Sequence, residues 1–357
     1  MPLDLASVPQ LARNLGRVVE IVRTLARYGL AGTIAQLDPG FVRRWASRIG
    51  VVRLAGESSE ARVRLALTDL GTTFIKLGQV LSTRRDVVGA ALADELCKLQ
   101  GNVPADPFDA TRDTVLAELG RPVSELFPEF DPVPLASASI GQVHRATLHD
   151  GRRVVVKVQH PNIAKRVAND LSILAELAAL ADQFLPDLRA YRPVAVVAEF
   201  RRVLTRELDF RRELRNLQLF RAAFAGDPGV VVPEPYPAFS SARVLTMEYL
   251  DGVPFTHIEK VVAAGGDPAD LARRGAATFL AMIFRDGIFH ADPHPGNLLY
   301  LPPTDAHPTG RIGLLDVGMV GRVDARLREK IERDPTQPLY LENRSRQGYI
   351  LNAHAPR

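Results

Sequence analysis

Hydrophobic residues recur every three or four positions along much of the chain, which is the spacing of helices with one buried face. This spacing predicts helices over residues 11–30, 59–79, 111–126, 161–185, 194–224 and 271–288. Ser58 or Ser59 can cap the second of them. Around His149-Asp150-Gly151 the pattern changes to short apolar runs, which predicts a hairpin over 143–159 because Asp-Gly accepts the positive φ values of a tight turn. Further strands are predicted at 230–232, 243–250, 298–300 and 312–315.

The first predicted helix has two different faces. Its apolar face gathers Leu11, Leu15, Val18, Val19, Val22 and Leu25, and its basic face gathers Arg13, Arg17, Arg23 and Arg27. Such a helix can lie on an anionic membrane surface with its apolar side down. It can equally dock on its own protein and leave the arginines in solvent, which is the interpretation that the pattern favours.

Composition narrows the class of protein. With 357 residues and 46% hydrophobic content, the chain has enough material for about two domains or one two-lobed unit. Cys97 is the only cysteine, so no intramolecular disulfide can form, and we expect it to be buried on a helix. The net charge of +4 is spread along the helices, which argues against a nucleic-acid partner.

Targeting signals are not evident in the sequence. The first residues lack the basic start and apolar core of a signal peptide, and no run of about 18 uncharged apolar residues occurs. The sequence therefore predicts a cytoplasmic protein without a transmembrane helix, with peripheral attachment at the inner face of the membrane left open.

Two acidic motifs follow one another where predicted strands meet loops. His290 to Asn297 reads HADPHPGN, and Asp316 opens the sequence Asp-Val-Gly after a predicted hairpin. In phosphoryl-transfer enzymes an Asp orients the acceptor, an Asn five residues later binds a metal ion, and a later Asp-x-Gly supplies the second carboxylate. Asp292 and Asn297 keep this spacing, and Asn297 with Asp316 offers hard oxygen ligands for Mg²⁺. Either motif alone is more typical of a surface turn, but their order favours a metal–nucleotide site.

A second group of candidate residues surrounds the predicted hairpin. The frame A-x-A-x-x-G-x-V corresponds to the kinase loop G-x-G-x-x-G-x-V, which covers the phosphates of ATP. Two alanines replace its first two glycines, which narrows backbone freedom and crowds the approach of a phosphate. Lys157, in Val-Val-Val-Lys, matches the lysine that contacts the α- and β-phosphates. The predicted nucleotide ligands in this region are Ala136, Ser137, Ala138, Ser139, Gly141, Val143 and Lys157.

Carboxylates on the predicted helix over 194–224 are candidates for pairing with Lys157. Glu207 and Glu213 are six residues apart and so face different directions on one helix. We prefer Glu213 as the partner of Lys157 and keep Glu207 as the alternative. In kinase order, Glu248 and Tyr249 fall at the hinge between lobes, where backbone groups hold the adenine ring.

The segment Lys76-Leu77-Gly78-Gln79 ends the second predicted helix. Lys76 and Gln79 lie three residues apart and therefore share one face. From periodicity alone this polar stripe is more simply a solvated surface than a functional site.

The motifs KLGQ, ASASIGQVH, VVVKVQHP, ELDFRREL, HADPHPGN and LLDVG, in this order from Lys76 to Gly318, resemble the ABC1/AarF/UbiB family of atypical kinases, which includes the coenzyme Q8 proteins. The resemblance implies an α+β, two-lobed protein-kinase-like fold with an alanine-rich nucleotide loop. It also implies a helical extension whose Lys76 and Gln79 cover the site and hinder protein substrates. Family members hydrolyse ATP, bind lipid and support ubiquinone biosynthesis.

The predicted organisation has four parts. They are a helical extension over 1–127, a kinase-like N-lobe over 128–250, a partial C-lobe over 251–330 and an irregular tail over 331–357. After Gly318 only residues 319–330 read as a helix, so the C-lobe is expected to be incomplete, as in a truncated member. The predicted function is an ATPase or small-molecule kinase that uses ATP and Mg²⁺. The alternatives are a nucleotide-gated accessory protein of a quinone-synthesis complex and a non-functional fragment.

Overall fold

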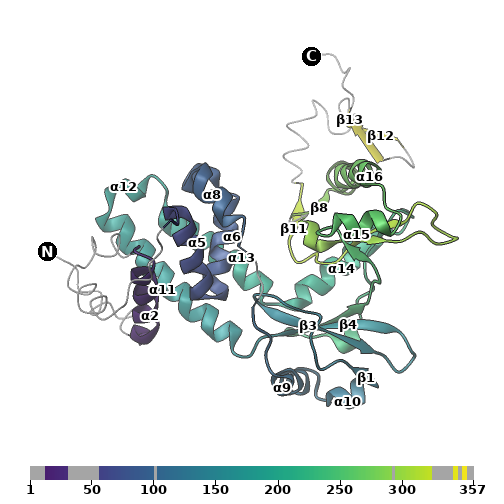
Figure 1. Ribbon diagram of the computed structural model, residues 1–357, viewed down its shortest axis with the longest axis horizontal. Coiled ribbons are helices and arrows are strands. Elements are labelled where there is room, and N and C mark those ends of the chain that lie inside the picture. Colours follow the sequence, from purple (N-terminus) through teal and green to yellow (C-terminus); the bar gives the residue numbers. More distant parts are fainter. Residues whose placement is uncertain are drawn as a thin grey trace. The chain divides into compact units, whose positions relative to one another are not determined.

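The computed structural model describes residues 13–30, 56–99, 103–291, 294–323, 341–344 and 348–351 (Figure 1). The chain forms two compact units. Unit 1 comprises Met1–Ala117, Asp131–His144 and Lys157–Leu208, and unit 2 comprises Glu118–Phe130, Arg145–Val156 and Asp209–Arg357. Asp292 lies outside the described residues, and the predicted domain boundaries stay predictions.

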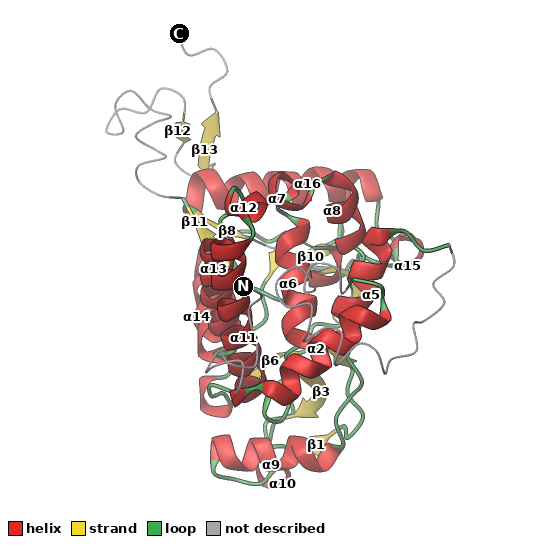
Figure 2. Ribbon diagram, turned by 90° about the vertical axis from the view of Figure 1, so that its left-hand side faces the viewer, coloured by secondary structure: helices red, strands yellow, loops and turns green. Residues whose placement is uncertain are grey.

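Helices dominate unit 1. They are α2 (Leu15–Arg27), α5 (Ser59–Leu70), α6 (Thr72–Ser82), α7 (Arg85–Val88), α8 (Ala90–Leu96), α11 (Ile163–Phe184), α12 (Pro186–Arg189) and α13 (Pro193–Glu207). Figure 2 shows α2, α5, α6 and α11 gathered in one region. Their shared core comprises Val18, Val19, Ile21, Val22, Leu70, Phe74, Ile173 and Leu180. The apolar residues Val18, Val19 and Val22 of α2 are therefore buried against its own protein, as the docked interpretation expected, but Arg17, which it placed in solvent, has a side chain that is only 13% exposed.

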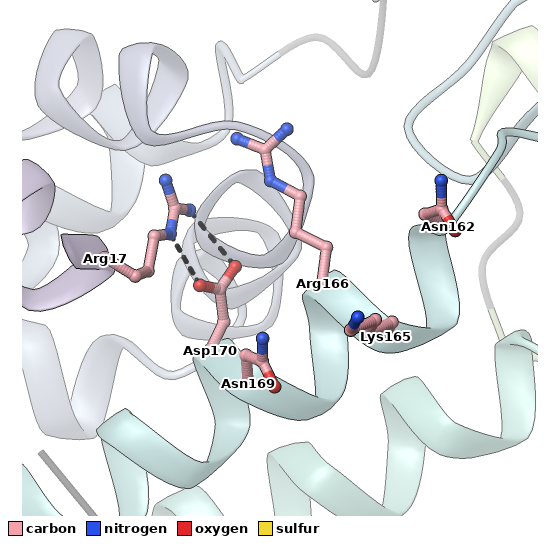
Figure 3. A pocket seen from close by; sticks show the side chains of 6 residues that line it. All are labelled: Arg17, Asn162, Lys165, Arg166, Asn169 and Asp170. Atoms are coloured by element: carbon pink, nitrogen blue, oxygen red, sulfur yellow. Dashed lines mark hydrogen bonds and ion pairs between the residues drawn. The ribbon is translucent and has the colours of Figure 1, made fainter. Parts of the chain in front are cut away.

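An ion pair fixes α2 to α11. Arg17 donates from Nε to Asp170 Oδ1 at 2.7 Å and from Nη2 to Asp170 Oδ2 at 3.1 Å, and Thr73 of α6 donates to the same carboxylate at 2.6 Å. Asp170 is 1% exposed, and burying an unpaired carboxylate would be costly. The contacts from α2 and α6 offset that cost. Figure 3 shows this pair at the edge of a depression of about 370 Å³, which none of the predicted site residues lines.

Three of the predicted helices are wrong in extent because each is broken, and one of them, predicted over 111–126, divides into Phe108–Leu119 and Val123–Leu126. The helix predicted over 59–79 ends at Gly71, whose φ of +88° suits only glycine, and α6 begins at the next residue. The helix predicted over 194–224 divides into α13 and α14 (Phe210–Phe224), since Asp209 caps α14 by accepting the Arg211 N–H at 3.2 Å. Glu207 and Glu213 therefore lie on different helices. Their separation of six residues does not determine the relative directions of their side chains, as it would on one helix.

The central sheet has the order β1-β3-β4-β6, with β2 paired to β3. Its strands are β1 (Glu129–Phe130), β2 (Ala136–Ser137), β3 (Gly141–Thr147), β4 (Arg153–Gln159) and β6 (Val244–Glu248). The predicted hairpin is confirmed, because Gly151 has a φ of +84° and the Leu148 N–H donates to Arg152 O at 2.9 Å. Both β3 and β4 contribute residues to each unit. Helices α9 (Phe108–Leu119) and α10 (Val123–Leu126) precede the sheet.

Unit 2 contains a second sheet of order β5-β10-β9-β7 and a separate pair of strands, β8 and β11. Its further elements are β5 (Val230–Val231), β7 (Val253–Pro254), α15 (Ile258–Ala263), α16 (Pro268–Ala281), the π-helical turn η3 (Met282–Asp286), β8 (Ile288–His290), β9 (Leu298–Leu301), β10 (Arg311–Leu314) and β11 (Val320–Arg322). Two 3₁₀ turns, η2 (Pro237–Phe239) and η4 (Pro295–Asn297), complete the set.

Three further expectations from the sequence need correction. The helix predicted over 319–330 is wrong at its start, where Val320–Arg322 pairs with β8 as a strand. The tail predicted to be irregular contains the antiparallel pair β12 (Leu341–Arg344) and β13 (Gly348–Leu351). Cys97, expected to be buried on a helix, is exposed and directly follows the last residue of α8.

Candidate functional site

A β-hairpin places Asn297 beside the residue that precedes Asp316. Strands β9 and β10 pair antiparallel with Leu298 opposite Leu314, and the Leu315 N–H donates to Asn297 O at 2.9 Å. Asn297 ends η4, directly before β9. The predicted hairpin between the two acidic motifs is thus confirmed, and it brings the two predicted metal ligands to the same end of the sheet.

A second strand pair joins the two motifs. His290 at the end of β8 lies opposite Val320 of β11, and the Ala291 N–H donates to Met319 O at 2.9 Å. The residue before Asp292 is therefore hydrogen-bonded to the residue after Gly318. Asp292 itself lies outside the described residues, so its predicted catalytic role stays a prediction.

Asp316 forms a local turn with the glycine that follows it. Its Oδ1 accepts the Gly318 N–H at 2.8 Å. A methyl group added at Gly318 would lie 3.0 Å from Asp316 Oδ1 and 3.9 Å from Glu213 Oε2. Glu213 of α14 is 6% exposed, so a buried carboxylate lies on this side of the Asp-Val-Gly segment.

The oxygen donors at this end of the sheet suit a hard cation. Asn297 offers an amide oxygen and Asp316 a carboxylate, the ligand types that Mg²⁺ accepts together with water and phosphate oxygens. Within the described residues, no group of three or more His, Cys, Asp or Glu side chains is arranged to hold a metal ion by itself. A cation here would therefore take further ligands from water or from a bound phosphate.

Asn216 is a residue of this site that the sequence analysis missed. Its Nδ2 donates to Val317 O at 2.8 Å and lies 3.4 Å from Gly318 O, so α14 holds the Asp-Val-Gly segment directly. Asn216 follows Glu213 by three residues and shares its helix face. The three-residue spacing from Glu213 was the signal in the sequence that could have identified Asn216.

The alanine-rich loop is closed by its own backbone. Ala136 lies opposite Val143 and Ser137 opposite Gln142 in the β2–β3 pair, and the Ala138 N–H donates to Gly141 O at 2.9 Å. Two residues that were not predicted from the sequence contact this loop from outside. His160 Nε2 lies 2.7 Å from Ala138 O, and the Thr72 hydroxyl donates to Ser139 O at 2.8 Å.

Buried polar groups support the strand that follows the loop. His144 of β3 contacts Asp131 O through Nδ1 at 2.8 Å and Gln142 Nε2 through its Nε2 at 3.0 Å. Burial lowers the pKa of His144. The ring is thus held neutral, with Nε2 accepting from Gln142 and Nδ1 donating to the carbonyl.

Lys157 and Glu213 belong to different units. Lys157 is a partly buried residue of β4 in unit 1, whereas Glu213 belongs to α14 in unit 2. Their predicted ion pair stays a prediction. Asp209, which lies between Glu207 and Glu213 in the sequence, has a structural role because it caps α14. A hydrogen bond from Arg211 Nε at 2.8 Å lowers the pKa of its carboxyl group.

Lys76 contacts Glu207. Its Nζ lies 2.8 Å from Glu207 Oε2, and the two side chains are 25% and 14% exposed. Gln79, one turn further along α6, donates to Leu99 O at 3.3 Å. The polar stripe of α6 is therefore engaged within unit 1, which excludes the interpretation that it is only a solvated surface.

The predicted hinge uses its N–H groups within the protein. The Glu248 N–H donates to Glu234 O at 2.8 Å, and the Tyr249 N–H donates to Arg153 O at 3.1 Å. The guanidinium groups of Arg145 and Arg153 each lie 5.2 Å from the centroid of the Tyr249 ring. Contacts of these residues with an adenine ring would therefore come from carbonyl oxygens and side chains.

A small-residue loop beside a strand that carries Lys157, and a hairpin that brings Asn297 to the segment leading to Asp316, are the arrangement of a kinase-like fold. The model of the ABC1 atypical kinase-like domain matches residues 98–343, and the chain belongs to this family. The predicted α+β kinase-like fold is thereby confirmed.

Two solved structures are similar to this chain to different degrees. The chain is similar to Rv3197 of Mycobacterium tuberculosis, solved in complex with erythromycin, with 29% identity and a TM-score of 0.50 over 79% of this chain and 73% of that one. It also matches the Rio2 kinase of Chaetomium thermophilum, solved as an ADP/Mg²⁺-phosphoaspartate complex, with 12% identity and a TM-score of 0.35 over 78% and 80% of the two chains. Among the described residues, no helix is long and apolar enough to cross a membrane.

Proposed function

We propose that this protein binds ATP with Mg²⁺ and hydrolyses it or transfers its terminal phosphoryl group to a small molecule. The observation that carries the proposal is the β9–β10 hairpin, which sets Asn297 beside the segment leading to Asp316. The turn at Gly318 and the anchor from Asn216 support it, because both hold the Asp316 carboxylate in place.

Each residue has a distinct task in this proposal. Lys157 holds the α- and β-phosphates with Glu213 as its partner, the alanine-rich loop covers the phosphates, and backbone groups at Glu248 and Tyr249 contact the adenine ring. Asp292 orients the attacking water or hydroxyl. Bound Mg²⁺, held by Asn297 and Asp316, would neutralise charge on the phosphate oxygens.

The contact between Lys76 and Glu207 supports a small acceptor. An ordered ion pair on α6 gives the extension a fixed place in unit 1, and a fixed extension can exclude a peptide while admitting water. Family membership supports a role in isoprenoid quinone biosynthesis, with lipid or proteins of that pathway as partners.

Nucleotide binding and turnover test the proposal separately. Mg-ATP should raise the thermal unfolding midpoint, because a ligand at 100 times its Kd stabilises the native state by about 2.7 kcal/mol. Phosphate release should then be measured with and without lipid vesicles, using Lys157→Met as the control. Binding without release in either condition would leave the accessory-protein alternative in place of the enzyme, and no binding at all would reject both.

The effects of substituting Lys76 and Glu207 on the free energy of unfolding should be coupled. Breaking a buried pair typically costs about 3 to 5 kcal/mol and an exposed pair is worth about 0 to 1, so this partly buried pair should fall between them, at about 1 to 2 kcal/mol. A double-mutant cycle of Lys76→Ala and Glu207→Ala, followed by urea unfolding and ATP affinity, isolates the coupling. Additive effects below about 0.5 kcal/mol, without a change in ATP affinity, would remove α6 from the site.

A further inference from the structure

Two consecutive carbonyl groups of the alanine-rich loop are held from outside the loop. Ala138 O lies 2.7 Å from His160 Nε2, and Ser139 O accepts the Thr72 hydroxyl at 2.8 Å. His160 is 8% exposed and Thr72 is 9% exposed, so water competes little for either contact. The loop is thereby fixed by the residue that follows β4 and by the first residue of α6.

His160 is itself held by further contacts. Its Nδ1 lies 2.5 Å from Asp106 Oδ2, and its backbone N–H donates to Ile140 O at 3.0 Å. A carboxylate and a carbonyl thus lie at the two ring nitrogens, and these two contacts fix the orientation of the ring. Asp106 is tied in turn to β3, since its N–H donates to Gln142 Oε1 at 2.8 Å.

Fixing these carbonyls also fixes the N–H groups that follow them. In a trans peptide the C=O and the next N–H point in opposite directions, and no cis peptide bond occurs among the described residues. The N–H groups of Ser139 and Ile140 therefore point away from His160 and Thr72. Within the part of the chain that the structure describes, neither N–H donates to a protein acceptor.

Two neighbouring donors of this kind are unusual in a covered position. Ser139 is 4% and Ile140 is 7% exposed, and buried backbone N–H groups nearly always have a partner. Successive backbone N–H groups that have no protein acceptor can bind an anionic oxygen. A phosphate group fits this requirement.

We propose that Thr72 and His160 are positioning residues that aim the Ser139 and Ile140 N–H groups at a nucleotide phosphate. The assignment rests on the proposed function and extends it to residues outside the loop. Because Thr72 begins α6, the same helix that carries Lys76 also sets the geometry of the phosphate loop. The extension thus acts on the nucleotide through a hydrogen bond to the loop backbone, in addition to the Lys76–Glu207 contact.

The test compares two adjacent threonines of α6. Thr72→Val removes the donor to Ser139 O while keeping the shape of the side chain, and Thr72→Ser restores the hydroxyl. Thr73→Val is the matched control, because Thr73 is 1% exposed and donates instead to Asp170 Oδ2 at 2.6 Å. Affinities for adenosine, ADP and ATP are measured by titration calorimetry, with unfolding midpoints measured alongside.

Thr72→Val should bind ADP and ATP about three- to tenfold more weakly, the size of one net hydrogen bond, and should bind adenosine as well as the wild-type protein does. Thr72→Ser should recover most of the lost affinity for ADP and ATP. Thr73→Val should lower the unfolding midpoint without weakening the binding of ATP. Asp106→Asn, which weakens the support of His160, should shift the affinities in the same direction as Thr72→Val.

The outcomes separate this assignment from the function on which it rests. If the wild-type protein binds no ATP, the proposed function and the positioning role are both overturned. If it binds ATP but Thr72→Val weakens adenosine and ATP equally, or Thr73→Val reproduces the effect of Thr72→Val, the positioning role alone is overturned.

Discussion

Replacing Gly141 with alanine should abolish detectable nucleotide binding and destabilise unit 1 by about 1 to 3 kcal/mol, the usual cost of overpacking. The added methyl group would lie 2.4 Å from Val158 O, 3.0 Å from Val158 C and 3.1 Å from Gln159 Cα. All three atoms belong to the backbone of β4, which cannot rotate aside as a side chain can. Since Lys157 precedes Val158 on that strand, a shift of β4 displaces the predicted phosphate ligand together with the loop.

Gly16→Ala is the matched control for this substitution. Gly16 lies within α2, and a methyl group added there meets no atom within 4 Å. The Gly16→Ala protein should gain about 0.5 to 1 kcal/mol in its free energy of unfolding, because alanine loses less conformational freedom than glycine when a helix forms. Urea unfolding and ATP titration of both variants make the comparison. Wild-type affinity in a stable Gly141→Ala protein would show that the loop does not depend on its close approach to β4.

Local signals in the sequence were sufficient for the elements that surround the site. Asp150-Gly151 predicted the β3–β4 turn because its φ requirement is a property of those residues alone. The short apolar runs at 298–300 and 312–315 predicted the β9–β10 hairpin between the two acidic motifs. The two-faced pattern of residues 11–30 predicted α2, although only the structure shows that its apolar face meets α5, α6 and α11.

The errors arose where one residue outweighed a continuing pattern. Apolar periodicity runs through Gly71 and through Asp209, yet a positive φ ends α5 at Gly71 and a side-chain cap starts a new helix at Asp209. Helix propensity is a weak preference that such features override. A capping Asp in the middle of a long apolar pattern is therefore better taken as a start signal than as an interior residue.

Supporting residues were harder to predict than the motifs they hold. Thr72, His160 and Asn216 act through single hydrogen bonds to backbone carbonyls, and any hydroxyl, imidazole or amide placed there by the fold can make such a bond. Their sequence neighbours do not reveal which carbonyl they meet. Lys76 differs from these residues because its charge requires a carboxylate, and the fold supplies Glu207 at 2.8 Å.

Asp316→Asn should weaken Mg-ATP binding about tenfold or more, equivalent to about 1.4 kcal/mol, and should change metal-free ATP binding much less. Asparagine keeps the size of aspartate, and its Oδ1 can still accept the Gly318 N–H that lies at 2.8 Å. The turn therefore survives while one negative charge is lost from the proposed metal site. The measurement is the rise in unfolding midpoint caused by ATP, in magnesium and in EDTA.

Asp150→Asn is the control for the loss of an aspartate in such a turn. Asp150 Oδ1 accepts the N–H of Arg152, two residues on, at 3.1 Å, just as Asp316 Oδ1 accepts from Gly318, but Asp150 lies at the exposed tip of the β3–β4 hairpin. Its substitution should leave the response to ATP unchanged in both buffers. If Asp316→Asn lowers the response equally in magnesium and in EDTA, the carboxylate acts on the nucleotide site without a cation, and Asp316 is not a metal ligand.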